Sequence, residues 1–96
     1  MPKYIALVNW TQQGVENVKD GPGRTAAAIE AAKAAGIVME TYYTMGRYDL
    51  VAIVDAPDDE TMTRVTLSIG AEGNIRTETM RAFTVEEMQG IVESLP

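Results

Sequence analysis

In the stretch VMETYYTMGRYDLVAIVD, Val38 to Asp55, two strand-like runs flank a turn at Gly46-Arg47. The second run is apolar at every position from Leu50 to Val54, without the alternation of a strand that has one solvated face. Successive strand side chains point to opposite faces of a sheet, so both faces of this strand are predicted to be buried. The run YIALV, Tyr4 to Val8, repeats the pattern near the N-terminus.

The doubly apolar strands predict self-association. A single layer of helices covers only one face of a sheet, which leaves the other face to be covered by something else. With 96 residues, the chain is expected to form one domain, residues 1–96, with limited capacity to bury a second core of its own. A second copy is the simplest cover, so we expect a homodimer or a larger homo-oligomer.

The composition narrows the classes of partner and the location. Residues are 46% hydrophobic and 23% charged, and no apolar run approaches the roughly 20 residues of a bilayer helix, so we expect a soluble protein without a membrane partner. The net charge of −6 and the pI near 4.5 disfavour binding to nucleic acid or to anionic lipid. The start, MPKYIALV, lacks a signal-peptide pattern, which predicts a cytoplasmic location.

The missing residue types narrow the chemistry. The chain contains no histidine and no cysteine, so the usual ligands of zinc, copper, haem and iron–sulfur clusters are absent. Thiol nucleophiles and imidazole bases are absent for the same reason. A carboxylate-rich magnesium or calcium site is the remaining metal option. We expect no metal, no cofactor and no catalytic residue.

Helix signals place two helices along the chain. The alanine-rich segment Arg24 to Ala35 predicts a helix that ends at Gly36, and its small side chains allow close packing on a sheet. A second helix is predicted from Pro57 to Gly70, because carboxylates in its first turn interact favourably with the helix dipole. Each helix follows a strand, as in a sheet covered by crossover helices.

Two further strands and a long loop complete the body of the domain. Strands are predicted at Lys3 to Trp10 and at Asn74 to Phe83. The loop Thr11 to Gly23 is polar and glycine-rich, although Val15 and Val18 predict one buried turn within it. Loops of this length in compact domains often carry function.

The last helix has the clearest signals in the chain. Thr84 and Glu87 have the spacing of a capping box. The apolar face of this helix consists of Met88, Ile91, Val92 and Leu95. We expect the helix to dock on its own subunit or on a partner.

The order β-α-β-β-α-β, followed by a short helix, predicts an α+β ferredoxin-like fold with two helices on a single face of a four-stranded antiparallel sheet. If the open faces of two such sheets meet, a dimeric α/β barrel forms, and cavities inside it or at its rim become natural ligand sites. The sheet residues of mixed character predicted to line such a cavity are Asn9, Tyr42, Thr77, Thr79 and Arg81.

Cations gather near the turn and the strand ends, although the chain is acidic overall. Guanidinium groups bind carboxylates and phosphates through paired hydrogen bonds, which makes an anionic small molecule a candidate ligand. Salt bridges between subunits are an equal alternative. The candidate ligand-binding residues are Asn9, Trp10, Lys19, Arg24, Arg47, Tyr48, Asp49, Arg76 and Arg81.

Several of these candidates also have simple structural explanations. Gly46 supplies a turn conformation that other residues do not readily adopt. Asp49 either caps backbone groups and pairs with an arginine, or it binds a ligand. Tyr48 is a core or interface aromatic on the structural interpretation, and Trp10 packs the adjacent loop or forms a wall of a pocket.

Three separated motifs, Asn9-Trp10-Thr11, Gly46-Arg47-Tyr48-Asp49 and Gly73-Asn74-Ile75-Arg76-Thr77, resemble the GYD-domain family in content and order. The resemblance spans essentially the whole chain, with Arg47 interposed in the motif that names the family. It implies a dimeric ferredoxin-like barrel and a family whose biochemical role is not established. The last two motifs are also similar to the effector-binding domain of the leucine-responsive regulators, in which this turn lies where dimers meet and amino acids bind.

Three functions from different classes stay open. The first is a homo-oligomeric small-molecule-binding module with a regulatory role. The second is a cofactor-independent enzyme of the isomerase or monooxygenase type, in which Asp49, Glu40, Glu78 or a tyrosine would serve as acid or base. The third is a structural protein that assembles with itself.

Overall fold

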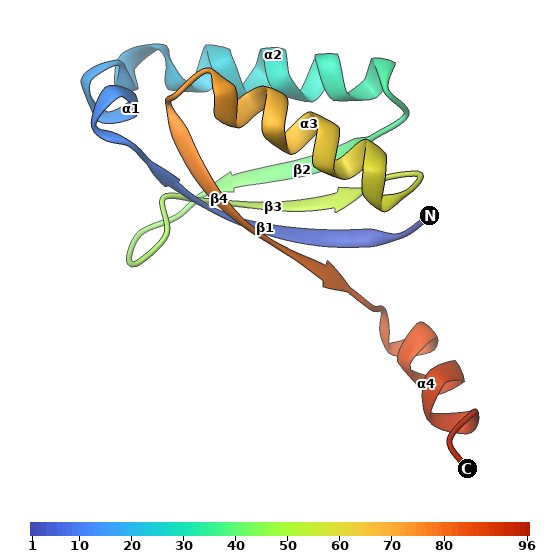
Figure 1. The fold of residues 1–96 in the computed structure, drawn as a ribbon. Helices are drawn as coiled ribbons and strands as arrows, with labels where there is room; N and C mark the ends of the chain where they lie inside the picture. The colour runs from blue at the N-terminus through green and yellow to red at the C-terminus, as the bar shows by residue number, and fades with distance from the viewer.

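The predicted order of elements is present in the structure, a computed structural model that describes all 96 residues. The sheet contains β1 (Lys3–Trp10), β2 (Val38–Tyr43), β3 (Leu50–Asp55) and β4 (Ile75–Ala82), antiparallel throughout and in the order β2-β3-β1-β4. The helices are α1 (Gln12–Glu16), α2 (Gly21–Ala34), α3 (Asp59–Ala71) and α4 (Val85–Glu93), with a short 3-10 helix, η1, at Val18–Asp20. Helices α2 and α3 lie on the same face of the sheet (Figure 1), which confirms the ferredoxin-like arrangement.

The register explains why the two central strands are apolar at every position. Tyr4 pairs with Val54 and Val8 with Leu50, and all four side chains are buried beneath the helices. The alternate positions face the other way and are only half-buried. These open-face residues are Ile5, Leu7, Val51 and Ile53. One face of the sheet is therefore covered within the chain, and its apolar opposite face is open to solvent.

The covered side forms a small core. Only 12 of 96 residues are buried, and ten of them form one hydrophobic cluster that spans β1, β3 and the adjacent helices. Ile37 and Val54 are the largest side chains that are almost fully buried. A core of this size leaves little reserve of stability in a single chain.

Local signals set the ends of the two covering helices. After α2, Gly36 has φ +78°, and the amide of Ile37 donates to the carbonyl of Ala32 at 2.9 Å, as at a left-handed helix C-terminus. At the start of α3, Asp58 accepts a hydrogen bond from the amide of Thr61 at 2.7 Å. Hydrogen bonds from the Thr61 side chain and backbone hold the pKa of Asp58 below its ordinary value.

The prediction for the long loop was wrong in part. The segment forms α1 and η1, and Val15 and Val18 are 51% and 40% exposed instead of buried. The buried residue of α1 is Gly14. Thr11 caps this helix by accepting from the amide of Gly14 at 3.1 Å, which lets a polar segment form a helix that its composition does not favour. Helix α2 also begins at Gly21, before the predicted start, because a proline fits the first turn.

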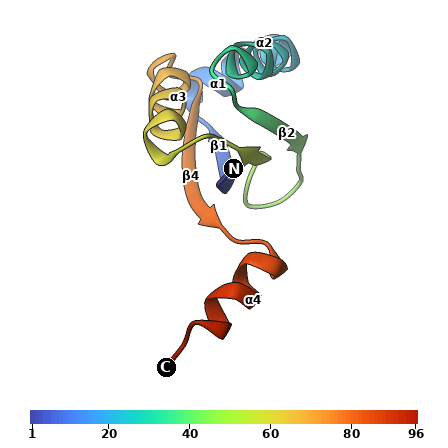
Figure 2. The same cartoon turned by 90° about the vertical axis from the view of Figure 1, so that its right-hand side faces the viewer.

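The last helix does not dock on its own subunit. The capping box is present, with reciprocal hydrogen bonds between Thr84 and Glu87 at 3.0 and 2.8 Å. However, α4 has no buried residue and projects beyond the end of β4 (Figure 2). The radius of gyration is 14.7 Å, against about 12.5 Å for a compact chain of this length. No helix in the structure combines the length and the apolar character needed to cross a membrane.

Candidate functional site

A cavity of about 120 Å³ lies between the helix-covered face of the sheet and the two helices above it. Its inner wall is mostly apolar, with Ala6, Val8 and Ala52 on the sheet side and Val65 and Ile69 on α3. No ligand-sized space of this kind was predicted on this face. The sequence argument placed the cavity between two sheets of a dimer, whereas this cavity lies within one chain.

The alanine-rich sequence of α2 explains the cavity. Close packing of this helix on the sheet was predicted, yet Ala32 is its only buried alanine. Ala28 lines the cavity, and its methyl group is too short to fill the space toward α3. The cavity continues into a groove of about 740 Å³ between α2 and α3, because Ala28, Val65 and Ile69 line both.

Two cations and one acidic residue lie around the mouth of the cavity. Arg24 and Glu72 line both the cavity and the groove, and Arg64 lines the groove. None of the three makes an ion pair. The guanidinium of Arg24 donates one hydrogen bond, to the carbonyl of Asn17 at 2.9 Å, so most of its donors are free. In a chain of net charge −6, this mouth is a local site of positive charge.

Aromatic residues form one end of the cavity. The rings of Trp10 and Tyr43 lie 6.3 Å apart and are tilted by 36°. The hydroxyl of Tyr43 shares a hydrogen bond of 2.8 Å with the hydroxyl of Thr25 on α2, which connects β2 to the helix beside Arg24. A side chain at Gly21 would approach both the Tyr43 hydroxyl and the Arg24 guanidinium, at 3.6 and 3.8 Å. The glycine thus leaves room at this end of the mouth.

Asp49 is held in a backbone network at the edge of this aromatic end. Its carboxylate accepts from the amide of Trp10 at 2.9 Å. Its own amide donates to the carbonyl of Val8, and its carbonyl accepts from the amide of Thr44, both at 2.9 Å. Gly46 has φ +114°, in the left-handed region that favours glycine. The turn therefore joins the end of β1 to the β2–β3 connection, and Asp49 fixes the backbone beneath Trp10.

A second set of hydrogen bonds joins the start of α1 to the turn that precedes β4. The amide of Thr11 donates to the carbonyl of Asn74 at 3.1 Å, and the Thr11 hydroxyl donates to the carbonyl of Gly73 at 2.6 Å. The side-chain amide of Gln13 donates to the Asn74 side chain at 3.0 Å. A methyl group on Gly14 would collide with the Asn74 carbonyl oxygen. This packing positions Asn74 and its neighbour Glu72 at the rim of the cavity.

Glu72, Asn74 and Arg64 are cavity or groove residues that the sequence argument did not select. Asn74 belongs to the last of the three motifs that carry the family resemblance, and it follows Gly73, which has φ +85° in the tight turn before β4. In the sequence, Gly73 was the one residue that indicated this turn, which brings Asn74 toward α1. Nothing comparable in the sequence places Arg64 at the groove, because its side chain sits on the exposed side of an ordinary helix.

The predicted site residues do not converge on one place. Trp10 and Arg24 line the cavity. Asn9 and Arg76 are paired in the register and lie on the open face of the sheet. Lys19 is exposed on η1 and does not line the cavity.

The tyrosine of the turn points to the open face. The hydroxyl of Tyr48 donates to the carboxylate of Glu78 at 2.9 Å, and this hydrogen bond raises the pKa of Tyr48 above its ordinary value. Arg47 is exposed, with its guanidinium carbon 5.6 Å from the centre of the Tyr48 ring. The sheet residues predicted to line a cavity between two sheets do not share one face. Asn9 lies on the open face, whereas Thr77 and Thr79 line the cavity on the helix-covered face.

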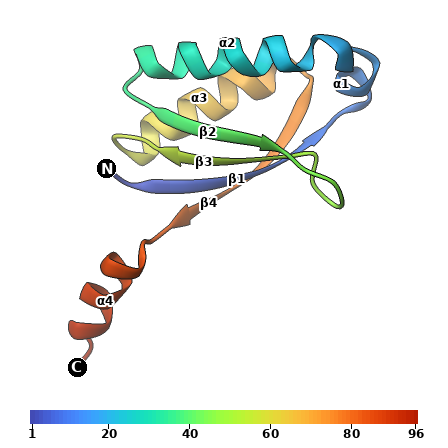
Figure 3. The same ribbon diagram turned by 180° about the vertical axis from the view of Figure 1, so that it is seen from behind.

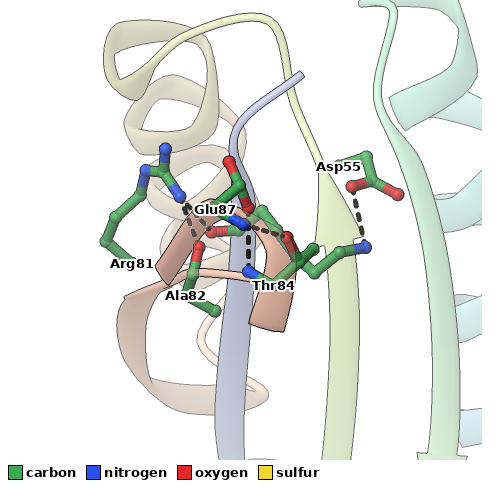
Figure 4. A network of polar contacts seen from close by, with 6 residues as sticks. Asp55, Arg81, Ala82, Thr84 and Glu87 are labelled. Atoms are coloured by element: carbon green, nitrogen blue, oxygen red, sulfur yellow. Dashed lines mark hydrogen bonds and ion pairs between the residues drawn. The ribbon is translucent and has the colours of Figure 1, made fainter. Parts of the chain in front are cut away.

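Arg81 lies at the far end of β4 and controls how the chain leaves the sheet. Its side chain donates to the carbonyls of Lys3, at 3.3 Å, and of Ala82 (Figure 4). Its guanidinium carbon is 5.7 Å from the ring centre of Tyr4 and 4.6 Å from that of Phe83. The Tyr4 ring beside Arg81 is itself held in place, because its hydroxyl donates to the carboxylate of Asp59, and this hydrogen bond raises the pKa of Tyr4. The contacts of Arg81 fix the start of the segment that leads into α4.

A comparison with known protein families identifies the family to which the chain belongs. The family model described as GYD domain matches residues 4–92. The chain belongs to the GYD-domain family. In this GYD-domain protein, the residues of the name motif hold the turn: Gly46 through its positive φ, Tyr48 through Glu78, and Asp49 through the backbone of Trp10.

Relatives of this GYD-domain protein share its length and its fold. A Thermus thermophilus protein named "Glutamine synthetase and cystathionine beta-lyase binding protein" is 31% identical over 90 residues, which cover 92% of this chain and 95% of that protein. The crystal structure of TTHA0845 from Thermus thermophilus superposes with a TM-score of 0.59 at 30% identity, over 88% of this chain and 96% of that one.

The fold also occurs within a larger regulator. The crystal structure of MtbAldR superposes with a TM-score of 0.61 at 17% identity, over 86% of this chain and 52% of that one. This similarity bears out the distant structural relationship to regulators of the leucine-responsive type. At this identity it concerns the fold alone.

Proposed function

We propose that this GYD-domain protein is a homo-oligomeric small-molecule-binding module with a regulatory role, and that its ligand occupies the cavity beneath α2 and α3. The observation that carries the proposal is the combination of an apolar cavity with a cationic mouth in an acidic chain. Binding sites of this kind surround most of a ligand with apolar groups and orient it through a few polar ones.

The dimensions and charges define a class of ligand. A cavity of about 150 Å³ is known to hold a benzene ring, so the 120 Å³ here suits a branched alkyl group or a small ring. The charged end of the ligand would lie in the groove beside Arg24, whose free donors match a carboxylate or a phosphate group. The ligand class is therefore a small anion with a compact apolar body.

The only tryptophan of the chain provides the assay, because Trp10 lines the cavity. We expect short branched and aromatic carboxylates to change the fluorescence of Trp10, and their neutral amides to bind at least about tenfold more weakly. Arg24→Ala should remove this preference. Arg47→Ala, which deletes an arginine outside the cavity, is the matched control and should bind like the wild type.

A second variant tests the cavity itself. Ala28→Leu places a larger side chain in the space between α2 and α3 and should abolish the response to every ligand, even with Arg24 intact. Native mass spectrometry of the protein purified without denaturation should show a bound small molecule that is absent from this variant. The proposal fails if no carboxylate changes the fluorescence, or if Arg24→Ala and Arg47→Ala have equal effects.

The homo-oligomeric part of the proposal is supported by the open face of the sheet. Ile5, Leu7, Val51 and Ile53 are all apolar, lie side by side on paired strands and have no cover within the chain. Large contiguous apolar patches are uncommon on monomeric proteins. We expect light scattering after gel filtration to give at least twice the mass of one chain, and a stable monomer at micromolar concentration would contradict this part.

A second candidate function is binding of a metabolic enzyme. It is favoured by the name of the Thermus thermophilus relative, which describes a protein that binds glutamine synthetase and cystathionine beta-lyase. Titration of this protein with each purified enzyme from its own host, in the presence and absence of a ligand found in the cavity, would test it. Saturable binding that depends on the ligand would join the two candidates into one regulatory function.

A further inference from the structure

The C-terminal helix is an apolar element without a surface to lie on. On α4, Met88, Ile91 and Val92 are 45%, 42% and 50% exposed, and Leu95, just after the helix, is 65% exposed. The helix has nine residues, whereas isolated helices shorter than about 12 to 15 residues are marginal in water. Its capping box stabilises the first turn only. A stable α4 therefore requires an apolar surface, and its own subunit does not supply one.

The open face of the sheet is an apolar surface of matching size. An eight-residue strand is about 26 Å long, and a nine-residue helix is about 14 Å long, so the helix fits along the strands. However, α4 leaves the end of β4 and runs away from the sheet, so it does not fold back over the open face of its own chain (Figures 1 and 3). The two unpartnered apolar surfaces can meet only between chains.

The open face of the sheet alone is smaller than the area that a stable interface buries on each partner. Four strands spaced by about 4.8 Å and up to about 26 Å long present roughly 500 Å². A stable specific interface buries roughly 800 Å² on each partner. Two sheets that meet over part of this face fall short of this value, and α4 of each chain, packed on the rest of the partner's open face, adds to the buried area.

The charges favour a second copy over a partner of another kind. From Thr84 to Pro96 the chain carries Glu86, Glu87 and Glu93 and no cation. At the opposite end of the sheet, Arg47 and Arg76 make no ion pair. A two-fold axis that turns the partner end for end would bring the acidic helix of each chain to the arginine end of the other. Such an interface is self-complementary, as a symmetric dimer requires.

We propose that α4 is an exchanged arm that packs its apolar side onto the open sheet face of a second copy, with its glutamates near the partner's Arg47 and Arg76. This inference rests on the proposed homo-oligomer and adds which segment forms it. The contacts of Arg81 with Lys3, Ala82 and Phe83 hold the arm in an outward direction before the partner binds.

Two matched variants test the arm in the full-length protein. Met88→Asp combined with Ile91→Asp places charges on the apolar side and should raise the dissociation constant of the dimer by at least about 100-fold in analytical ultracentrifugation. Gln89→Asp adds a charge on the polar side of the same helix and should leave the constant within about threefold of the wild type. Equal constants for the wild type and the double variant would overturn the exchanged arm.

Cross-linking identifies the occupant of the face directly, because the chain contains no cysteine of its own. One tagged copy carries Ile91→Cys, a differently tagged copy carries Leu7→Cys, and a short bismaleimide is added to the mixture. Products that join the two tags support the exchange. A wild-type monomer would overturn the homo-oligomer itself, whereas a dimer without these products would overturn the arm alone. If the Met88 and Ile91 charges abolish binding of a metabolic enzyme but leave the dimer intact, the occupant is that enzyme and the proposal is wrong.

Discussion

Replacing Asp49 separates a structural role from a ligand-binding one, because its carboxylate accepts the amide hydrogen of Trp10 at 2.9 Å. Asp49→Ala removes a hydrogen bond to a charged group, which contributes about 1.5 to 3 kcal/mol, and leaves a partly buried amide without a partner. We therefore expect the free energy of unfolding to fall by about 2 to 3 kcal/mol. For a chain of this length, that change lowers the melting temperature by roughly 10 to 20 °C.

Asp49→Asn is the informative partner of this variant. Its side-chain oxygen can still accept from the Trp10 amide, so only the charge is lost, and we expect a cost of about 1 kcal/mol. Both variants are measured by urea titration at one fixed protein concentration, since any oligomer makes stability depend on concentration. Trp10 fluorescence and far-ultraviolet circular dichroism follow the same transition.

Met45→Ala, at the same turn, is the control. Met45 is 99% exposed, so the loss of its side chain should change the stability by less than about 0.5 kcal/mol. The structural interpretation of Asp49 is refuted if Asp49→Ala costs no more than this control. It is also refuted if Asp49→Asn is as damaging as Asp49→Ala, because the charge itself would then be required.

Two further predictions concern close packing and acid stability. Gly14→Ala forces a methyl group into the carbonyl of Asn74 and should cost about 1 to 3 kcal/mol in urea titrations, whereas Gly23→Ala, with nothing within 4 Å of the new methyl, should cost nothing. Hydrogen bonds at two helix N-termini hold the pKa values of Asp58 and Glu87 below their ordinary values of 3.8 and 4.5. Their stabilisation is present above those values and is lost as the pH falls through the folded-state values. The urea midpoint should therefore fall less steeply below pH 5 in the Asp58→Asn, Glu87→Gln double variant, and parallel curves would contradict this assignment.

The fold could be predicted because its signals are local and independent of one another. The apolar run from Leu50 to Val54 identifies a strand, Gly36 ends a helix, and the Thr84 and Glu87 pair starts another. The order of such elements restricts the topology to few choices. The helix at Gln12–Glu16 was missed because its stability depends on Gly14 packing against Asn74, a contact between distant segments that no local pattern records.

The candidate site was harder to predict because it depends on the faces to which side chains point. Trp10 and Arg24 were selected and do line the cavity. Thr77 and Thr79 were assigned to the wrong face, since a shift of one residue in register moves every side chain of a strand to the other side. The sequence also does not reveal that α2 and α3 stand apart, because that spacing depends on how Ala28 and its neighbours fit the sheet.

The cavity carries an energetic consequence that connects the fold to the proposed function. The cavity opens onto the groove, so its apolar wall faces solvent, and apolar surface contributes about 25 cal/mol per Å² when it is removed from water. A ligand whose apolar body fills the cavity should cover this wall and raise the melting temperature. Ala28→Leu should raise it by filling the same space, without any ligand and with no further increase when ligand is added. If Ala28→Leu is instead less stable than the wild type, α2 closes onto the sheet in solution and leaves no room for a ligand there.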